Sequence, residues 1–320
     1  MNPYVLRLKP AFKDNIWGGR RLIEEFHMDC PLERAAEAWV LSCHKDGQSV
    51  VANGPLQGLE LSEAIERMGK DCLGERGNQF SFFPLLIKFI DAREDLSIQV
   101  HPDDAYAMQN EHGYGKTEMW YVMDSDPGSR LYYGFTHPIS RQEFARRIQD
   151  QTLTEVLNAV EVRRGDCFYI PAGTIHAIGK GLLIAEIQQN SNTTYRVYDY
   201  GRRDKQGNTR ELHIEKAMEV TTLGPAPAMA QYPVRTAPGG SVQTLVDCAY
   251  FTTDKLELDG CLSLSAGGES FQALLCMQGN GTLRAHGQSL DFQPGDCLFV
   301  PAGTGEFHLE GKGLLLLSRV

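Results

Sequence analysis

The sequence lacks any pair of cysteines at C-x-x-C spacing. Its eight cysteines are spread over 320 residues, so neither a zinc ribbon nor a thioredoxin-type redox motif is indicated. Their density is also too low for a small disulfide-bonded scaffold, and Cys167 lies within the apolar run 167–170. We therefore expect reduced, buried thiols that pack as small apolar side chains.

Long apolar runs are also missing. No uninterrupted run approaches the roughly 18 residues of a membrane-spanning helix, and the stretch 82–90 is broken by Pro84 and Lys88. Residues 1–10 alternate polar and apolar side chains and contain no apolar core of a secretory signal. We therefore expect a cytoplasmic protein without a membrane segment.

The chain has no excess of positive charge. Its 31 Lys and Arg residues face 41 Asp and Glu residues, which gives a net charge of −10. This balance disfavours a general nucleic-acid or anionic-membrane binder, but a local cluster of cations can still hold a small anionic ligand. With 42% hydrophobic and 22% charged residues, the chain is expected to fold, and its length favours two domains or one domain with insertions.

An internal repeat organises the sequence. Residues 165–174 read GDCFYIPAGT and residues 295–304 read GDCLFVPAGT, with seven of ten positions identical. Both copies continue to GKGLL, at residues 179–183 and 311–315. Each copy predicts a tight turn, a short strand and a second turn. The chain therefore contains two related modules.

The strand pattern favours a mainly β sandwich or barrel. Further strands are predicted at residues 96–100, 119–123, 129–133, 182–187, 274–277 and 314–317. Helices are expected as insertions in the first module, at residues 62–68, after Ser140, after Thr152 and near residues 213–220. The stretch 224–240, rich in Pro, Ala and Gly, is the candidate linker. We therefore expect domains at residues 1–223 and 224–320.

Four polar residues on the first module's predicted strands suggest a metal site. Gln99 and His101 share one face of the strand 96–100, Glu118 begins another strand, and His176 follows the first copy of the repeat. Two nitrogen and two oxygen ligands suit Zn²⁺, Mn²⁺, Fe²⁺ or Co²⁺. The alternative is that each histidine is an ordinary hydrogen-bonded core or surface residue.

The second module offers an internal comparison. His176 aligns with Glu306 without a gap, or with His308 if the two-residue insertion is placed first. The preceding strands contain no Gln-x-His pair. The second module is therefore expected to lack a metal and to act as a packing or interface element.

The stretch from Gly165 to His176 resembles the second sequence motif of the cupin superfamily, whose members are jelly-roll barrels that commonly hold a metal. More specifically, the chain resembles the short-form type I mannose-6-phosphate isomerases (phosphomannose isomerases). The matching strings are WGG at 17–19, EAW at 37–39, SVVANGP at 49–55, PLLIK at 84–88, LSIQVHPDD at 96–104, GKTEMWY at 115–121 and IPAGTIHA at 170–177, followed by matches from Glu186 through Arg196 to Tyr200. This resemblance implies two cupin-type jelly-roll barrels, the first with helical insertions.

The resemblance also implies roles for individual residues. The family's zinc ligands fall on Gln99, His101, Glu118 and His176, its active-site arginine on Arg196, and its lysine before the metal glutamate on Lys116. Ser97, Lys88 and Glu186 match positions that line the pocket in longer members. Those members have Ser-Asp-Asn where this chain has Ser191, Asn192 and Thr193. An acid-base role at Asn192 is therefore not implied, although its amide can bind a sugar hydroxyl.

The implied reaction is the interconversion of mannose 6-phosphate and fructose 6-phosphate through an enediol, with one Zn²⁺ per chain. Glu186 or a metal-bound water is the candidate proton carrier, and Lys116 and Arg196 are candidate cations for an enediolate or for the phosphate. Taken alone, Arg196 is equally interpreted as a surface cation. A metal-dependent oxygenase or epimerase, or a sugar-binding cupin without catalysis, remain alternatives, and the oligomeric state is left open.

Overall fold

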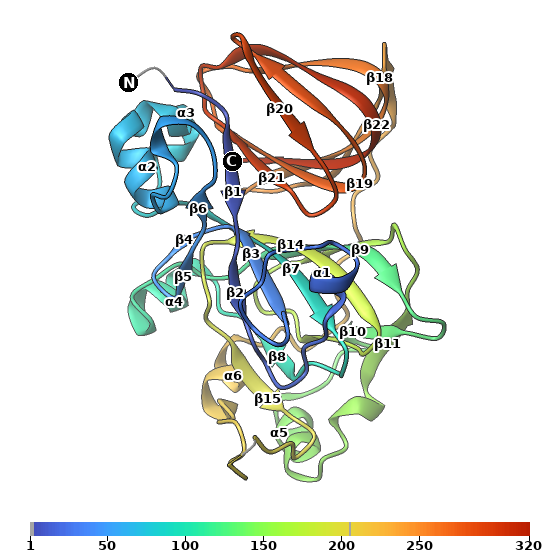
Figure 1. Cartoon of the computed structure of the whole chain (residues 1–320). Coiled ribbons are helices and arrows are strands. Elements are labelled where there is room, and N and C mark those ends of the chain that lie inside the picture. Colours follow the sequence, from blue (N-terminus) through green and yellow to red (C-terminus); the bar gives the residue numbers. More distant parts are fainter. Residues whose placement is uncertain (1–2, 205) are drawn as a thin grey trace.

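The computed structural model describes residues 3–204 and 206–320. Most of its regular secondary structure is β-strand, and every described helix lies before Thr221 (Figure 1). The mainly β class and the helical insertions in the N-terminal part are therefore confirmed. No helix in the described ranges combines the length and the apolar character needed to cross a membrane.

Two sheets build the N-terminal part. One has the strand order β12-β9-β14-β7-β3-β2 and the other β11-β10-β13-β8-β15, while β4 and β5 pair as a separate hairpin. The strands are β2 (Ala11–Lys13), β3 (Glu37–Leu41), β4 (Cys43–His44), β5 (Gly47–Gln48), β7 (Leu85–Ala92), β8 (Ile98–Val100), β9 (Glu118–Ser125), β10 (Arg130–Phe135), β11 (Leu157–Glu161), β12 (Cys167–Ile170), β13 (His176–Ile178), β14 (Leu182–Gln189) and β15 (Tyr195–Tyr198). Trp120 and Ile184 of the first sheet share an apolar cluster with Leu131 and Ile178 of the second. The two sheets therefore pack on each other around a common core.

Strand β14 is buried along its whole length and contributes to two cores. Alternate residues of a strand point to opposite faces. Leu183 and Ile187 lie in the cluster that joins this sheet to the C-terminal part, whereas Ile184 lies in the cluster between the N-terminal sheets. Glu186 shares the face of Ile184, so the strand period places its carboxylate inside the N-terminal part.

A nine-stranded sheet forms the C-terminal part. Its order is β16-β17-β18-β22-β19-β21-β1-β6, with β20 paired to β19. The strands are β1 (Leu6–Lys9), β6 (Val50–Val51), β16 (Arg235–Ala237), β17 (Gly240–Asp247), β18 (Thr252–Ala266), β19 (Gln272–Ala285), β20 (Gln288–Phe292), β21 (Cys297–Val300) and β22 (Gly305–Arg319). Leu6 lies opposite Phe299 in the antiparallel pair of β1 and β21. The first strand of the chain therefore belongs to the C-terminal sheet (Figure 1).

Helices form at three of the four predicted places, and three helices that were not predicted form at residues 21–24, 74–77 and 104–110. The helices are α1 (Arg21–Glu24), α2 (Leu61–Met68), α3 (Gly74–Gly77), α4 (Asp104–Asn110), α5 (Arg141–Gln149) and α6 (Ile214–Val220), with 3₁₀ turns at Gly54–Leu56, Lys70–Leu73 and Leu153–Glu155. The Ser140 hydroxyl accepts a hydrogen bond from the Glu143 backbone N–H at 3.1 Å and caps α5 as predicted. The helix predicted after Thr152 is wrong. Only the turn Leu153–Glu155 forms there, without a side-chain cap, because Leu157 already pairs with Phe135 in β11.

The predicted linker is too long. Strand β16 begins at Arg235 and β17 begins at Gly240, so only residues 224–234 connect the two parts without a strand. Gly239 makes the turn between these strands with a φ of 79°, and a Cβ there would lie 2.1 Å from the Cys261 carbonyl oxygen. Residues 235–240 therefore belong to the sheet although their composition is typical of loops.

Two further sequence predictions concern closed barrels and reduced thiols. Among the strand pairings of residues 3–204 and 206–320, no sheet closes on itself, so the two jelly-roll barrels stay a prediction. All eight cysteines are free, as expected. Cys72, Cys276 and Cys297 are buried, but Cys261 is exposed, because it lies on an outward-facing position of β18.

Candidate metal centre and catalytic cavity

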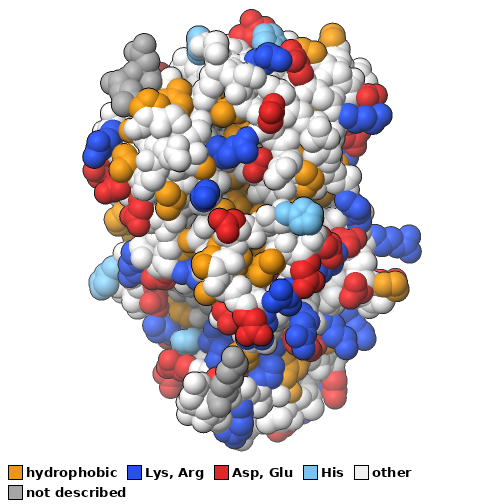
Figure 2. Space-filling view, in the orientation of Figure 1, with side chains coloured by type: hydrophobic (Ala, Val, Ile, Leu, Met, Phe, Trp, Pro, Cys, Tyr) orange, Lys and Arg blue, Asp and Glu red, His pale blue; other side chains and the backbone are white. Residues whose placement is uncertain are grey.

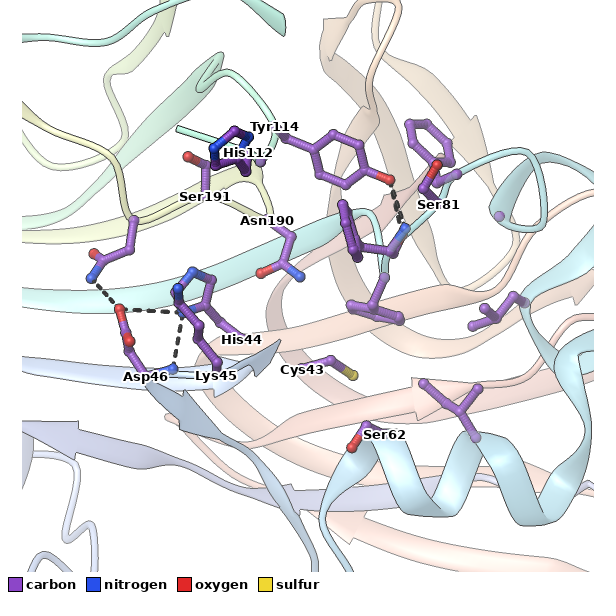
Figure 3. A pocket seen from close by; sticks show the side chains of 18 of the residues that line it. Cys43, His44, Lys45, Asp46, Ser62, Ser81, His112, Tyr114, Asn190 and Ser191 are labelled. Atoms are coloured by element: carbon purple, nitrogen blue, oxygen red, sulfur yellow. Dashed lines mark hydrogen bonds and ion pairs between the residues drawn. The ribbon is translucent and has the colours of Figure 1, made fainter. Parts of the chain in front are cut away.

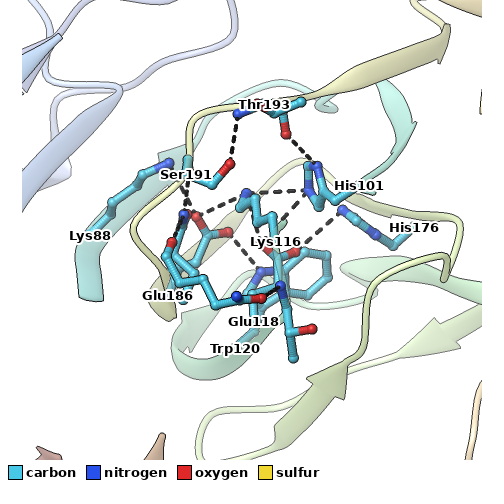
Figure 4. Close-up of polar contacts among 12 residues, drawn as sticks. Lys88, His101, Lys116, Glu118, Trp120, His176, Glu186, Ser191 and Thr193 are labelled. Atoms are coloured by element: carbon cyan, nitrogen blue, oxygen red, sulfur yellow. Dashed lines mark hydrogen bonds and ion pairs between the residues drawn. The ribbon is translucent and has the colours of Figure 1, made fainter. Parts of the chain in front are cut away.

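Three predicted metal ligands meet in the interior of the N-terminal part. His101 follows β8, Glu118 begins β9 and His176 begins β13. One ligand atom from each residue lies within 4.8 Å of the others, and all three side chains are buried. In the described ranges this is the one group of three or more histidine, cysteine or acidic side chains that is placed to hold a metal (Figure 4).

Gln99, the fourth predicted ligand, lies in the middle of β8. It is the antiparallel neighbour of His176 on one side and of Arg196 on the other. Gln99 also lines the cavity described below. The strand register therefore places the predicted amide ligand between the histidine and the predicted active-site arginine.

Backbone carbonyls fix both histidine rings. His101 Nδ1 donates to the Thr193 carbonyl and His176 Nδ1 donates to the Thr174 carbonyl, each at 2.8 Å. Burial lowers the pKa of His101 well below its usual value and that of His176 to about 4. Both rings are therefore neutral and present the Nε2 lone pair to the centre, which is the tautomer that a metal ligand requires.

Glu118 completes the donor set. Its Oε1 lies 3.3 Å from His176 Nε2 and its Oε2 lies 3.8 Å from His101 Nε2. Glu118 Oε1 and His176 Nε2 are buried without a hydrogen-bond partner. Such atoms are costly to bury, and a bound cation would satisfy them. Two imidazoles and a carboxylate are ligands that Zn²⁺ prefers, so the residues present fit a divalent metal.

A row of alternating charges runs from this centre to the cavity wall (Figure 4). Lys116 Nζ lies 2.7 Å from Glu118 Oε2 and 3.6 Å from Glu186 Oε1. Lys88 Nζ lies 3.3 Å from the same Glu186 oxygen and 3.5 Å from Glu37 Oε2. The row holds three carboxylates and two ammonium groups, so it carries one surplus negative charge. A divalent cation would turn this into one surplus positive charge, which suits an anionic substrate.

The two lysines of this row keep Glu186, which lies between them, ionised. Burial favours the neutral form of Glu186, but the ammonium groups of Lys116 and Lys88 outweigh burial and hold the pKa of this carboxyl below its usual range. The Trp120 indole N–H also donates to Glu186 Oε2 at 2.9 Å. Glu186 Oε1 is buried and has only the ion-pair contacts with Lys88 and Lys116, at 3.3 and 3.6 Å. Glu186 is therefore an ionised carboxylate with one oxygen left to accept a proton.

A cavity of about 500 Å³ opens beside the row. It is lined by all of the predicted substrate and catalytic residues, namely Ser97, Lys88, Asn192, Lys116, Glu186 and Arg196. Ser97 and Lys88 are buried, whereas Asn192 is exposed at the edge and its amide donates to Asp46 Oδ2 at 3.0 Å. The structure therefore gathers on one wall residues that are far apart in the sequence.

Arginine side chains add positive charge to the cavity. Arg196 donates from Nη1 to the Glu211 carbonyl at 2.9 Å, and its Nε is buried without a hydrogen-bond partner. Burial and the neighbouring Arg210 lower the pKa of Arg196. Arg210 also lines the cavity and is held by Asp199 through two hydrogen bonds of 2.8 and 2.6 Å. Sequence reasoning missed Arg210, because it lies in a segment without a strand pattern.

Glu37 and Trp39 were also missed as cavity residues, although the Glu-Ala-Trp string carries a signal. Residues two apart on a strand share a face, and the Trp39 indole N–H donates to Glu37 Oε2 at 2.7 Å. The ionised carboxylate is thereby oriented toward Lys88.

A second cavity of about 730 Å³ lies on the other side of the segment 190–193. It is lined by the β4–β5 hairpin, by α2 and by the segments around Phe82 and Tyr114 (Figure 3). Asp46 and Asn192 line both cavities, so their hydrogen bond separates the two spaces. The segment between the cavities also supplies the Thr193 carbonyl that orients His101.

Acidic and basic side chains are interspersed over the face seen in Figure 2. The concentration of cations inside the cavity therefore contrasts with this face, on which the two signs are mixed. This matches the expectation that an anionic ligand is held locally.

Comparison with known proteins identifies the family. A model of the phosphomannose isomerase type I catalytic domain matches residues 5–156, and a model of the mannose-6-phosphate isomerase cupin domain matches residues 241–320. Mannose-6-phosphate isomerase ManA of Bacillus subtilis (strain 168) is 40% identical over 100% of both chains. The crystal structure of the mannose 6-phosphate isomerase from Bacillus subtilis has a TM-score of 0.93 at 35% identity and covers 99% of this chain and 100% of that one. A crystal structure of mannose 6-phosphate isomerase bound with zinc and yttrium shares the fold, with a TM-score of 0.78 at 18% identity over 99% of each chain. The predicted isomerase family is confirmed: the chain belongs to the type I mannose-6-phosphate isomerases.

Proposed function

We propose that the chain interconverts mannose 6-phosphate and fructose 6-phosphate in the 500 Å³ cavity. The observation that carries this proposal is that three buried side chains able to bind a metal lie next to a cavity lined by lysines and arginines. One divalent metal, Zn²⁺, would be held by His101, Glu118, His176 and Gln99. When bound, it would polarise the sugar oxygens at C1 and C2 as a Lewis acid.

Arg196 and Arg210 bind the anionic end of the substrate in this proposal. Both line the cavity, and a guanidinium can pair with two oxygens of one phosphate group. Asp199 holds Arg210 by two hydrogen bonds, which limits the freedom that the side chain loses on binding. Ser97 and the Asn192 amide contact sugar hydroxyls.

Glu186 moves the proton between the two carbons. Aldose–ketose isomerisation transfers one proton from C2 to C1 and one from the O2 hydroxyl to O1, through an enediol. Glu186 Oε1 takes the C2 proton and returns it to C1, because Oε2 already accepts the Trp120 hydrogen bond, whereas Oε1 has only the longer ion-pair contacts with Lys88 and Lys116. The Lys116 ammonium stabilises negative charge on the sugar oxygens, and Lys88 keeps Glu186 ionised in the resting site.

The proposal includes a division of the chain into two cupin domains. Residues 1–223 form the catalytic, metal-binding cupin, and residues 224–320 form a second cupin without a metal. A pair of jelly-roll barrels is supported by the repeat and by the sandwich packing of the N-terminal sheets. In the second part, strand β1 is added from the N-terminal residues.

The test is a coupled assay for fructose 6-phosphate formed from mannose 6-phosphate, combined with metal analysis of the same preparation. We expect one equivalent of divalent metal per chain, loss of activity after chelation and recovery with Zn²⁺. Full turnover by metal-free protein would contradict the metal assignment. Tight binding of mannose 6-phosphate by the metal-loaded protein, without any fructose 6-phosphate, would instead indicate a sugar-binding cupin.

A further inference from the structure

The two modules can be aligned through their strand pairings. Ile170 and Val300 occupy the same place in the sequence repeat. Ile170 lies opposite Glu118 in the pair of β12 and β9, and Val300 lies opposite Gln272 in the pair of β21 and β19. Gln272 therefore occupies in the second module the position that the metal glutamate occupies in the first.

The same register identifies the other counterparts of the metal ligands. His176 pairs with Gln99, and Glu306 pairs with Ser265, which favours the ungapped alignment of His176 with Glu306 over His308. Gly267 follows Ser265 by two residues, as His101 follows Gln99, so Gly267 is the counterpart of His101. The amide, imidazole and carboxylate ligands of the first module are thus replaced at every position.

The cavity wall is nevertheless retained. The wall positions Glu37, Trp39, Lys88, Ile90 and Glu186 correspond by strand pairing to Val242, Thr244, Asp254, Leu256 and Leu317, respectively. All five counterparts line a single cavity of about 1090 Å³, and so does Gln272. The second module therefore has a cavity at the position of the catalytic one, with different chemistry on its wall.

The charged residue on this wall has the opposite sign to its counterpart in the first module, and a neighbouring arginine balances it. Asp254 stands where the first module has Lys88, and Leu317 stands where it has Glu186. Asp254 is 5% exposed and accepts hydrogen bonds from Thr244 Oγ1 at 2.7 Å and from Arg319 Nη1 at 2.6 Å. The guanidinium balances the carboxylate, so the inner wall has no net charge to attract an ion.

One buried acceptor on the wall has no partner. Gln272 is 9% exposed, and its Nε2 donates to the Ser265 carbonyl at 2.8 Å. Its Oε1 is buried without a hydrogen-bond partner. A buried amide oxygen of this kind requires a donor, and Gln272 lines the cavity. The group that completes this wall is therefore a neutral hydrogen-bond donor.

We propose that the C-terminal cavity is a second ligand site, which binds an uncharged polyhydroxylated molecule such as a neutral sugar or polyol. Ligand hydroxyl groups donate to the Gln272 oxygen, to Asp254 and to the Thr244 and Thr252 hydroxyl oxygens, whose own hydrogens are donated to Asp254 and Asp247, and they accept from Arg319. The rim carries Arg76, Arg235, Asp247 and Glu269 in equal numbers of each sign, which gives no preference for a phosphate. The volume is close to the upper end of the roughly 300–1,000 Å³ typical of small-molecule sites. This site is separate from the proposed isomerase reaction and needs no metal.

The test measures binding of four neutral probes to the metal-loaded full-length chain by calorimetry and ligand-observed NMR. The probes are mannitol and the methyl glycosides of mannose, glucose and galactose, which cannot be isomerised because they have no free carbonyl group. We expect at least one probe to saturate a single site per chain. Gln272→Met, which keeps the side-chain length, should weaken this binding about tenfold, and Thr244→Val should weaken it as well.

Thr282→Val is the matched control. Thr282 lies on the same strand, and its hydroxyl bonds Asp291 at 2.8 Å on the exposed surface, so this variant should bind the probe as the parent chain does. Gln272→Met should also keep the parent kcat/KM for mannose 6-phosphate, which reports that the chain is folded. The proposal is overturned if none of the four probes binds, if Gln272→Met binds as tightly as the parent, if inorganic phosphate displaces the probe, or if Arg196→Ala abolishes probe binding.

Discussion

The two cavities of this chain occupy equivalent places in two related modules, yet among the described residues only the first has the group of candidate metal ligands beside it. Gln99, His101, Glu118 and His176 in the first correspond to Ser265, Gly267, Gln272 and Glu306 in the second. The strand pairings that position these residues are the same in both. The difference teaches that the sheet supplies the positions, whereas a few side chains at those positions decide between metal chemistry and neutral binding.

The largest expected effect comes from removing a ligand at one of two equivalent positions. His176→Ala should lose the metal and lower turnover by about 10³-fold, because only one of the two imidazole ligands then remains to hold the cation. Glu306→Ala is the control at the equivalent position and should keep both metal and activity. Metal analysis and the coupled assay measure the two variants, and equal losses in both would refute the distinction between the modules.

The converse change installs the ligands in the second module. The triple variant Gly267→His, Gln272→Glu, Glu306→His should bind a second equivalent of Zn²⁺ per chain. Binding should be weaker than at the first site, because the Thr304 carbonyl, the counterpart of the Thr174 carbonyl that orients His176, is already bonded to His286. A Cβ at Gly267 meets no heavy atom within 4 Å, so the first of these changes is sterically free. Zinc titration with a chromogenic competitor gives the stoichiometry. If it stays at one in the folded variant, the positional equivalence is wrong.

Arg196→Ala separates substrate chemistry from metal binding. The side chain lines the cavity but offers no metal ligand, so turnover should fall about 10²-fold while one equivalent of metal remains. Arg284→Ala, at an exposed ion pair with Glu310 in the second module, is the control and should leave turnover unchanged. Loss of the metal in Arg196→Ala would show that the arginine supports the ligand set instead.

Trp120→Phe tests the support of the proton carrier. The indole N–H donates to Glu186 Oε2, so its removal should lower kcat about tenfold and leave the metal bound. Leu274, the counterpart of Trp120, is apolar, and Leu274→Met should not affect kcat. An unchanged kcat in a well-folded Trp120→Phe variant would argue against Glu186 as the group that moves the proton.

The smallest effect concerns charge beside the cavity. Burial alone would raise the pKa of Asp199, but hydrogen bonds from Arg210 and Arg202 hold it below its usual value. A carboxyl with a lowered folded-state pKa stabilises the protein above its unfolded pKa of about 3.9, and this contribution is lost as the pH falls through the folded-state pKa.

Asp199→Asn should therefore cost about 1 kcal/mol of unfolding free energy at pH 7, and the difference from the parent should shrink on acidification below about pH 4. Urea unfolding at pH 7 and pH 3 measures it. Asp259→Asn, at an exposed ion pair with Lys312 in the second module, should change stability little at either pH. A pH-independent difference for Asp199→Asn would mean that the effect is steric.

The candidate site was predictable where short-range patterns carry it. Strand period placed Gln99 and His101 on one face, and the repeat singled out His176. Pairing between strands that are far apart in the sequence could not be predicted from such patterns. Nothing in residues 6–9 indicates that β1 pairs with β21, and Arg210 reaches the cavity only because Asp199 holds it there.

Local signals also failed where tertiary contacts overrode them. The capping pattern at Thr152 and Glu155 is as good as the one at Ser140, but β11 begins too soon for a helix to continue. Residues 235–240 have a loop-like composition, yet they pair as strands with the long sheet. In both places, pairing between strands outweighed the intrinsic preference of the segment.

The pairing of β1 with β21 sets the order in which the chain can finish folding. Leu6 is synthesised well before its partner Phe299, because almost all of the chain lies between them. Until then β1 has no strand to pair with on that side, and unpaired strand edges favour association between chains. The C-terminal sheet is therefore completed only after β21 has been synthesised, so the nascent chain exposes this edge of β1 to aggregation until β21 emerges.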